Sequence, residues 1–292
     1  MTTDGRLVIL AGGISSRMKK SAAPEFSDDP ALIHDADVKA KSMIGVGRNQ
    51  RPFLDYLLFN ARQMGYKDVL IVIGEGDDSI RSYYGHKDED NEVSGLKISY
   101  AIQHIPAGRT KPMGTADALY QALKGKDGWM GKRFTVCNSD NLYSEKALGL
   151  MREHKYRCAM IDYDRHALQF EWSRIERFAV TLKDGDGFLT GIIEKPSEAQ
   201  IKAATGRDGF VGVSMNIFDL QFDMIFPFLE SVPFHPLRNE KELPEAVTMM
   251  VGAYPQCLFA YPLSVHVPDL TEKGDILPVK KYLETYFENA TF

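Results

Sequence analysis

Continuous apolar runs alternate along the chain with stretches whose apolar residues recur at helical spacing. In the first half, strands are predicted over residues 7–11, 69–73, 96–102 and 134–137, because such runs are typical of buried parallel strands. Helices are predicted over residues 53–64, 115–123 and 144–154. This alternation of strand and helix predicts a mainly parallel sheet with helices on both of its faces.

The second half of the chain predicts antiparallel strands that join the same sheet. Segments 178–182 and 189–194 flank Lys183-Asp-Gly-Asp-Gly187, a sequence that favours a hairpin turn. Further strands are predicted over residues 159–163, 210–218 and 258–267, and helices over residues 220–229 and 276–287. No repeat or shift in composition divides the chain, so residues 1–292 are expected to form a single α/β domain.

Two polar stretches are predicted to lack regular structure. Residues 19–40 show little periodicity and are expected to be an insertion, with a mobile lid as one interpretation. Residues 87–92 are mostly charged and are expected to form a solvated loop.

Charge and composition exclude several classes of partner. The net charge is −5 and the isoelectric point is near 5.8, so no overall basic field attracts nucleic acid or an anionic membrane. Cys137, Cys158 and Cys257 are widely spaced and odd in number, which indicates buried thiols in a reducing compartment. No apolar run approaches the roughly 20 residues of a membrane span, and the first is too short for a signal peptide. We therefore expect a cytoplasmic protein, and the sequence leaves open whether it forms a homo-oligomer.

Residues that suit phosphate binding follow the first predicted strand. In Leu10-Ala-Gly-Gly-Ile-Ser-Ser-Arg17, the glycines let the backbone approach a ligand, successive N–H groups form an anion site, and Arg17 matches phosphate oxygens. A glycine-rich turn with a solvated arginine is the alternative for this motif alone. Asn138-Ser-Asp-Asn141 follows the strand at residues 134–137. Because ligands bind beyond the carboxyl ends of strands in open α/β sheets, both turns are expected on one rim.

Other nucleotide-binding signatures are absent from the sequence. Gly45-Val-Gly47 lacks the third glycine of a dinucleotide fingerprint and follows no predicted strand. The chain has no Gly-Lys-Ser/Thr loop, and its seven histidines form no His-Glu-x-x-His pair. Kinase and dehydrogenase functions are therefore disfavoured.

Five motifs, in order along the chain, resemble those of the nucleotidyltransferases that make nucleotide sugars from sugar 1-phosphates. The resemblance runs from Leu7 to about Ile276, and it rests on the five motifs together because each is weak alone. The motifs are residues 10–17 with Lys41-Ser-Met-Ile-Gly-Val-Gly47, Gln103 with Gly108-Arg-Thr-Lys-Pro-Met-Gly-Thr-Ala-Asp-Ala-Leu119, Asn138-Ser-Asp140, Ile192-Ile-Glu-Lys-Pro196, and Val267-Pro-Asp-Leu-Thr-Glu-Lys-Gly-Asp-Ile276.

The resemblance implies a Rossmann-like fold of the nucleotide-diphospho-sugar transferase type, with a mixed, mainly parallel sheet. It also implies that the chain transfers a nucleoside monophosphate from a nucleoside triphosphate to a sugar 1-phosphate and releases pyrophosphate. These two substrates are the implied partners, Mg²⁺ is the implied cofactor, and roughly residues 160–275 are the implied sugar-binding half.

The resemblance further implies a role for each matching residue. The implied catalytic residues are Arg17, Lys41, Asp140 and Lys195, and the implied Mg²⁺ ligands are Asp140 and Asp269. The implied nucleotide contacts are Leu10, Ala11, Gly12, Gly13, Ser15, Gln103, Gly114 and Thr115. The implied sugar contacts are Asn141, Glu194, Lys195 and Asn216.

Three of the nucleotide contacts have specific expected chemistry. Gln103 carries both a donor and an acceptor, as recognition of a base needs. Gly114 lets a ring pass close to the backbone, and Thr115 is expected to cap the helix at residues 115–123.

Several residues have competing interpretations. Lys39 competes with Lys41 as the lysine that holds phosphate, and either Asp140 or Asp269 could instead cap a helix. A Glu194–Lys195 pair at a strand end is otherwise a common exposed salt bridge. Asp275 is expected to cap the last helix rather than bind the metal.

Ser15 stands where the family usually has a second glycine. That form also occurs in relatives that transfer a nucleotide to other acceptors, so a polyol phosphate, phosphocholine or molybdopterin acceptor is the nearest alternative. A catalytically inactive protein that binds sugar nucleotides and regulates a partner is the alternative from another class.

Overall fold

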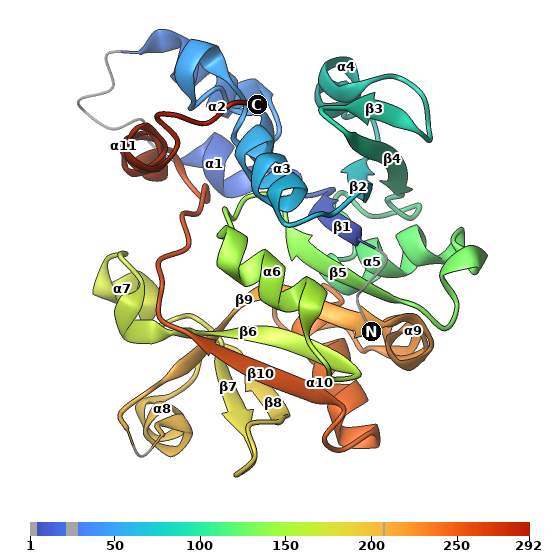
Figure 1. Cartoon of the computed structure of the whole chain (residues 1–292), viewed down its shortest axis with the longest axis vertical. Coiled ribbons are helices and arrows are strands. Elements are labelled where there is room, and N and C mark those ends of the chain that lie inside the picture. The colour runs from blue at the N-terminus through green and yellow to red at the C-terminus, as the bar shows by residue number, and fades with distance from the viewer. Residues whose placement is uncertain (1–4, 22–28, 207) are drawn as a thin grey trace.

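The computed structural model describes residues 5–21, 29–206 and 208–292, and in that part of the chain ten strands form one mixed sheet (Figure 1). The strand order is β10-β6-β9-β5-β1-β2-β4-β3, while β7 pairs with both β8 and β9. The strands are β1 (Arg6–Ala11), β2 (Asp68–Gly74), β3 (Asn91–Val93), β4 (Leu96–Gln103), β5 (Arg133–Asn138), β6 (Cys158–Asp164), β7 (Val180–Lys183), β8 (Leu189–Ile193), β9 (Gly212–Gln221) and β10 (Leu258–Leu263).

Two groups of parallel strands make up most of this sheet. In one group β1 is parallel to β2 and β5, and β2 is parallel to β4; in the other, β6 is parallel to β10. Strand β9 runs antiparallel between β5 and β6 and joins the two groups. The predicted mixed, mainly parallel α/β sheet is therefore confirmed.

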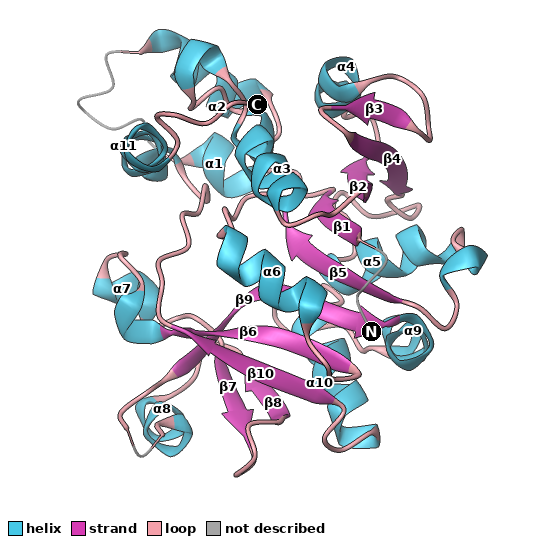
Figure 2. Cartoon of the chain, in the orientation of Figure 1, coloured by secondary structure: helices cyan, strands magenta, loops and turns pink. Residues whose placement is uncertain are grey.

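Alternate residues of β1 enter two different cores, one on each face of the sheet. Leu7 and Ile9 share a buried cluster with α3 (Phe53–Gln63), α6 (Glu145–Glu153) and α11 (Ile276–Tyr286). Val8 and Leu10 share the other with α5 (Thr115–Lys124), α9 (Phe222–Ser231) and α10 (Leu243–Ala253). Helices on both faces are thus confirmed (Figure 2), and no helix in the described residues is long and apolar enough to cross a membrane.

The stretch expected to be an irregular insertion is partly helical. It contains the end of α1 (Ser16–Lys20) and all of α2 (Pro30–Val38), while residues 22–28 lie outside the described part of the chain. Helix α2 begins at Pro30 because the Asp29 side chain accepts hydrogen bonds from the Ala31 and Leu32 backbone N–H groups. Only Leu32 and Ala36 of this helix are buried, so its sequence carries too weak a periodicity to predict a helix.

Other elements were also absent from the sequence prediction. β3 (Asn91–Val93) forms on the edge of β4 and takes in the last two residues of the expected solvated loop. The Asn91 side chain donates to Lys87 O and Ile98 O. Helix α10 was missed as well, although it starts with Pro at its first turn. The remaining helices that the sequence did not predict are α4 (Asp78–Tyr84), α7 (Trp172–Ile175) and α8 (Glu198–Ala204).

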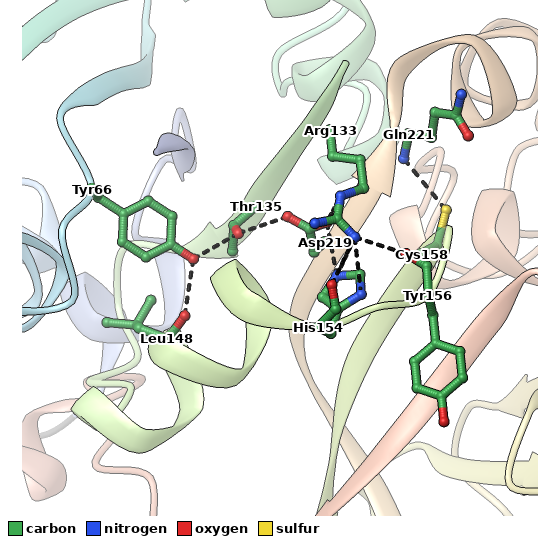
Figure 3. Close-up of polar contacts among 9 residues, drawn as sticks. All are labelled: Tyr66, Arg133, Thr135, Leu148, His154, Tyr156, Cys158, Asp219 and Gln221. Carbon is green, nitrogen blue, oxygen red and sulfur yellow. Dashed lines mark hydrogen bonds and ion pairs between the residues drawn. The ribbon is translucent and has the colours of Figure 1, made fainter. Parts of the chain in front are cut away.

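A buried polar network joins β9 to β5 and to the segment between α6 and β6 (Figure 3). The fully buried Asp219 carboxylate accepts from Thr135 Oγ1 of β5 at 3.0 Å and lies 2.9 Å from His154 Nε2, just after α6. Burial raises the pKa of Asp219, and Arg133 Nε, 3.4 Å from Oδ1, offsets part of that rise. The same Thr135 Oγ1 that donates to Asp219 also lies 2.7 Å from Tyr66 Oη. Because an uncompensated buried charge is costly, this network fixes the register in which β5 and β9 meet.

Candidate active site

Two adjoining cavities lie at the carboxyl ends of the strands. A cavity of about 580 Å³ is lined by the turn after β1, the end of β4 and the start of α5. A cavity of about 1420 Å³ is lined by residues after β5, after β8 and before α11. The residues that line both are Arg17, Asn138, Asp140, Glu194, Lys195, Asn216 and Arg238. The turns after β1 and β5 therefore lie on one rim, as the sequence predicted.

The residues singled out in the sequence line one or both cavities, and Asp140, Glu194, Lys195 and Asn216 line both. The smaller cavity is lined by every predicted nucleotide contact: Leu10, Ala11, Gly12, Gly13, Ser15, Gln103, Gly114 and Thr115. The larger cavity is lined by the predicted sugar contacts and Mg²⁺ ligands: Asn141, Glu194, Lys195, Asn216, Asp140 and Asp269. The structure brings both sets together, and the chemical role of each residue stays a prediction.

The turn after β1 is shaped by a serine in the left-handed region. Ser15 has φ 53°, a conformation that costs a non-glycine residue some strain, which explains why a glycine also suits this position. Its Oγ accepts a hydrogen bond from Lys41 N at 3.3 Å and so connects the turn to the next segment. Arg17 lines both cavities and has no ion-pair partner among the described residues. Its guanidinium is therefore free to bind an anion.

Lys41, and not Lys39, reaches the site. Lys41 Nζ lies 2.7 Å from Asp140 Oδ2 and lines the smaller cavity. Lys39 instead forms an i,i+4 ion pair with Asp35 at 2.9 Å on α2, with its side chain 41% exposed. The structure thus separates two lysines that the sequence left in competition.

The Gln103 side chain has an amide donor and a carbonyl acceptor, and only the acceptor is available to a ligand. The side chain is buried at the end of β4, and Nε2 donates to Gly114 O and to Asp117 Oδ2, both at 2.9 Å. The amide donors are therefore engaged inside the protein. Only the carbonyl oxygen Oε1 is left to accept a hydrogen bond from a ligand.

The start of α5 differs from the predicted cap. Gly114, with φ 110°, occupies the N-cap position, and Thr115 is the first helical residue. The Thr115 hydroxyl accepts from the Leu243 N–H at 3.0 Å and so joins α5 to α10 instead of capping its own helix. A Cβ on Gly114 would collide with the backbone carbonyl of Lys241. Glycine is needed here by the backbone itself, whether or not a ring packs on it.

Asp140 and Asp269 lie side by side although they are far apart in sequence. Asn141 and Asp269 pair across an isolated antiparallel bridge, and Leu270 N donates to Asp140 O at 2.9 Å. Neither aspartate caps a helix, since Ser144 caps α6 and Glu272 precedes the 3₁₀ turn before α11. Burial, together with the charge of Asp140, raises the pKa of Asp269 to about 6.

Each of the two carboxylates has a cationic partner. Asp140 pairs with Lys41, while Asp269 Oδ2 lies 2.7 Å from Arg174 Nη2 and its Oδ1 accepts from Thr271 Oγ1 at 2.9 Å. The described residues contain no group of three His, Cys, Asp or Glu side chains placed to hold a metal. Mg²⁺ needs only one or two carboxylates when phosphate oxygens and waters complete its shell. The pair fits that requirement, and the raised pKa of Asp269 indicates a site that a cation would stabilise.

Asp275 does not cap α11 with its side chain. Its Oδ2 accepts from the Thr271 and Glu272 N–H groups at 2.7 and 2.9 Å, and its Oδ1 pairs with Arg174 Nη1. Asp275 stands at the N-cap position of α11, as expected, but its side chain holds the 3₁₀ turn before the helix.

Two residues that line the larger cavity have left-handed backbone. Lys195 (φ 46°) follows β8, and Asn216 (φ 56°) lies where β9 bulges against β6. Left-handed backbone at non-glycine positions is uncommon and concentrates at ligand sites. Lys195 has no ion-pair partner among the described residues, whereas Glu194 Oε2 lies 3.5 Å from Arg238 Nη2. Glu194 therefore pairs with Arg238, and the alternative of a Glu194–Lys195 salt bridge is not seen among the described residues.

Asn141 is engaged in the fold. It is 4% exposed, and its Oδ1 lies 3.4 Å from both Asn138 Nδ2 and Tyr143 Oη. Although the residue lines the larger cavity, its carbonyl oxygen already accepts hydrogen bonds from the chain.

Sequence reasoning missed three charged residues of the site. Arg174 lies on α7 and pairs with both Asp269 and Asp275. Arg238 lines both cavities and pairs with Glu242 at 2.6 Å, and burial raises the pKa of Glu242 to about 7. Arg238 and Glu242 are oppositely charged and four residues apart just before Pro244, a spacing from which their ion pair could have been predicted. For Arg174 the sequence gives no signal.

Comparisons with known proteins bear on the fold and the family of the chain. The family model described as nucleotidyl transferase matches residues 37–225. Glucose-1-phosphate adenylyltransferase 1 of Vibrio vulnificus (strain CMCP6) is 24% identical over 223 residues, which cover 75% of this chain and 49% of the relative. D-glycero-alpha-D-manno-heptose 1-phosphate guanylyltransferase of Campylobacter jejuni is 26% identical over 163 residues, which cover 54% of this chain and 60% of the relative. The matches thus span about half the length of these curated relatives.

Among solved structures, HddC from Yersinia pseudotuberculosis superimposes with a TM-score of 0.61 at 16% identity. The match covers 97% of this chain and 100% of that one. At this identity the likeness concerns the fold.

Proposed function

Since the chain belongs to the nucleotidyl transferase family, we propose that it transfers a nucleoside monophosphate from a nucleoside triphosphate to a sugar 1-phosphate. The observation that carries the proposal is the position of Asp140 and Asp269, which lie together where a phosphate-suited cavity meets a larger polar one. The relatives named for adenylyl and guanylyl transfer to sugar 1-phosphates support the same reaction class. We assign the sugar-binding half of the single domain to residues 160–275.

The reaction is an in-line displacement at the α-phosphorus. A phosphate oxygen of the sugar 1-phosphate forms a new P–O bond, the bond from the α-phosphorus to the bridging oxygen breaks, and pyrophosphate leaves with the electron pair. The attacking oxygen is already anionic at neutral pH, so the site needs no general base. Catalysis then depends on positioning and on neutralising charge.

The residues divide this work between the two substrates. The N–H groups of the turn after β1 hold the triphosphate together with Arg17, which has no ion-pair partner in the described part of the chain. Lys41 transfers from Asp140 to a phosphate oxygen when the nucleotide binds. Lys195, for which the described residues likewise offer no ion-pair partner, holds the phosphate of the acceptor. Asp140 and Asp269 would hold Mg²⁺, which when bound neutralises charge on the phosphates.

The proposal is tested by incubating the protein with ATP, GTP, CTP, UTP or dTTP and a panel of sugar 1-phosphates, with Mg²⁺ or with EDTA. We expect pyrophosphate release that requires both substrates and stops in EDTA. A parallel arm offers a polyol phosphate and phosphocholine as acceptors. Nucleotide binding without pyrophosphate release with any acceptor would overturn the proposed activity and favour a regulatory binding protein.

A further inference from the structure

A row of aromatic rings leads away from Asp269 along one wall of the larger cavity. The row consists, in spatial order, of Phe170, His266, Tyr282 and Tyr286, and all four residues line the cavity. Successive ring centroids are 4.9, 6.1 and 4.3 Å apart. At the inner end, Arg174 pairs with Asp269 at 2.7 Å and lies over the Phe170 ring, with its Cζ 4.4 Å from the centroid. The aromatic row therefore begins beside the two candidate Mg²⁺ ligands and extends outward from them.

The outer part of the row belongs to a face of α11 that is turned to the cavity. Pro278, Lys281, Tyr282, Thr285 and Tyr286 recur at the spacing of one helix face, and all five line the cavity. Eight residues of α-helix separate the first from the last, a length of about 12 Å. Helices α7 and α11 lie on the same side of the molecule, at the left of Figure 1. This wall is longer than a single sugar ring.

The wall offers ring faces next to hydrogen-bonding groups. Tyr286 is 67% exposed, so its ring is accessible to a ligand. His266 Nδ1 accepts from the Gln169 backbone N–H at 3.1 Å, and burial, with the charge of Arg174, lowers the pKa of His266 to about 4. The imidazole is therefore neutral at pH 7 and carries its proton on Nε2, as a donor. A pyranose has apolar C–H faces that pack on aromatic rings and hydroxyls that need such donors and acceptors.

The larger cavity has more room than a monosaccharide phosphate fills. Its volume of about 1420 Å³ exceeds the roughly 300–1,000 Å³ of pockets that hold drug-sized ligands. A further cavity of about 430 Å³ shares Tyr282, Thr285 and Tyr286 with it, so space for a ligand continues past the tyrosine pair. An acceptor whose phosphate is held at Lys195 leaves this outer part of the cavity vacant unless the acceptor is longer than one sugar.

We infer that the acceptor is a sugar 1-phosphate that carries a second sugar unit, and that this second ring packs on Tyr282 and Tyr286. The inference rests on the proposed function, since it takes the larger cavity to be the acceptor site. It adds the size of the acceptor and the wall that selects it. The aromatic row is continuous with the inner site, so the second ring belongs to the same molecule as the phosphate.

The test compares acceptors that share glucose 1-phosphate at the reducing end. Pyrophosphate release is measured with maltose, lactose, isomaltose and gentiobiose 1-phosphates, and with glucose, galactose and mannose 1-phosphates, using the best of the five nucleoside triphosphates. The four disaccharides cover α and β linkages to O4 and O6. We expect the best disaccharide 1-phosphate to have a kcat/KM at least about tenfold above that of the best monosaccharide 1-phosphate, because it buries additional apolar surface.

Three variants locate the preference on the aromatic row. Tyr286→Ala removes an exposed ring and should reduce the tenfold ratio of kcat/KM values to about twofold, while Tyr286→Phe keeps the ring and should keep most of the ratio. Leu277→Ala is the matched control, since it removes an exposed apolar side chain of α11 that does not line the cavity. Its ratio should equal that of the wild type.

The outcomes separate this inference from the proposed function. Release that is as fast with a monosaccharide 1-phosphate as with every disaccharide 1-phosphate would overturn the inference and leave the proposed function standing. A disaccharide preference that Tyr286→Ala does not reduce would also overturn it, because the second ring would then lie elsewhere. No pyrophosphate release with any of the seven acceptors would count against the proposed function, and this inference would fall with it.

Discussion

Asp269 pairs with Asn141 across an isolated antiparallel bridge, and this contact places Asp269 beside Asp140. The segment around Asp269 follows the last strand of one parallel group, whereas the segment around Asp140 follows β5 of the other. The site therefore depends on both groups of strands being joined correctly.

Asp140→Ala should lower the rate of pyrophosphate release by about 10²–10³-fold, because one of two adjacent carboxylates suited to a divalent cation is removed. The measurement is kcat/KM at saturating Mg²⁺. Asp186→Ala, in the exposed turn between β7 and β8, is the control and should keep the wild-type rate. Near wild-type release by the Asp140 variant would refute the assignment of this residue.

Lys195→Met should weaken binding of the sugar 1-phosphate by about 10–100-fold, since a charged hydrogen bond to phosphate is lost. Nucleotide affinity, measured by calorimetry without the acceptor, should change little. Lys202→Met on the exposed face of α8 serves as the matched control. If nucleotide and acceptor affinity fell together in the Lys195 variant, the lysine would belong to the triphosphate end instead.

Glu242 should make the stability of the protein depend on pH. Burial raises its pKa from 4.5 to about 7, so between these values the folded protein binds a proton that the unfolded chain has released. The contribution to stability is therefore fully present below pH 4.5 and is lost as the pH rises through 7. Glu242→Gln should gain up to about 3 kcal/mol of unfolding free energy relative to wild type between pH 4.5 and pH 8.

Urea unfolding at pH 5 and pH 8 measures this change. The control is Glu245→Gln, which replaces an exposed carboxylate in the first turn of α10, the helix that Glu242 precedes. Its free energy of unfolding is expected to match that of the wild type at both pH values. Parallel pH profiles for Glu242→Gln and wild type would contradict the raised pKa.

Gly114→Ala should cost about 2 kcal/mol or more of stability, because alanine is strained at φ 110° and its Cβ meets the backbone of Lys241. Nucleotide affinity should fall as well, since the residue lines the smaller cavity. Gly252→Ala in α10 has open space around the added Cβ and should keep or slightly raise the melting temperature. Equal melting temperatures for the two variants would show that the backbone at Lys241 moves to accommodate the added Cβ, and would contradict the expected strain.

The sequence predicted the strands of the sheet well because each is a short apolar run, and it placed the turns after β1 and β5 on one rim. It missed α2 and α7, since short helices that bury one or two residues leave little periodicity. The pairing of Arg174 with Asp269 was out of reach for the same reason. Whether Lys39 or Lys41 enters the site, and which edge of Gln103 is free, depends on three-dimensional contacts that spacing does not encode.

The place of β9 in the sheet has a consequence for how the chain is made. Strand β5 has β1 on one side and β9 on the other, so a nascent chain on the ribosome carries an unpaired β5 edge until residues 212–221 have emerged. During that interval the sheet formed by β5, β1, β2 and β4 has an exposed edge at β5, which can pair with strands of other chains. Stalled chains ending before Gly212 should therefore be digested readily by protease, and chains extended well beyond Gln221 should resist it.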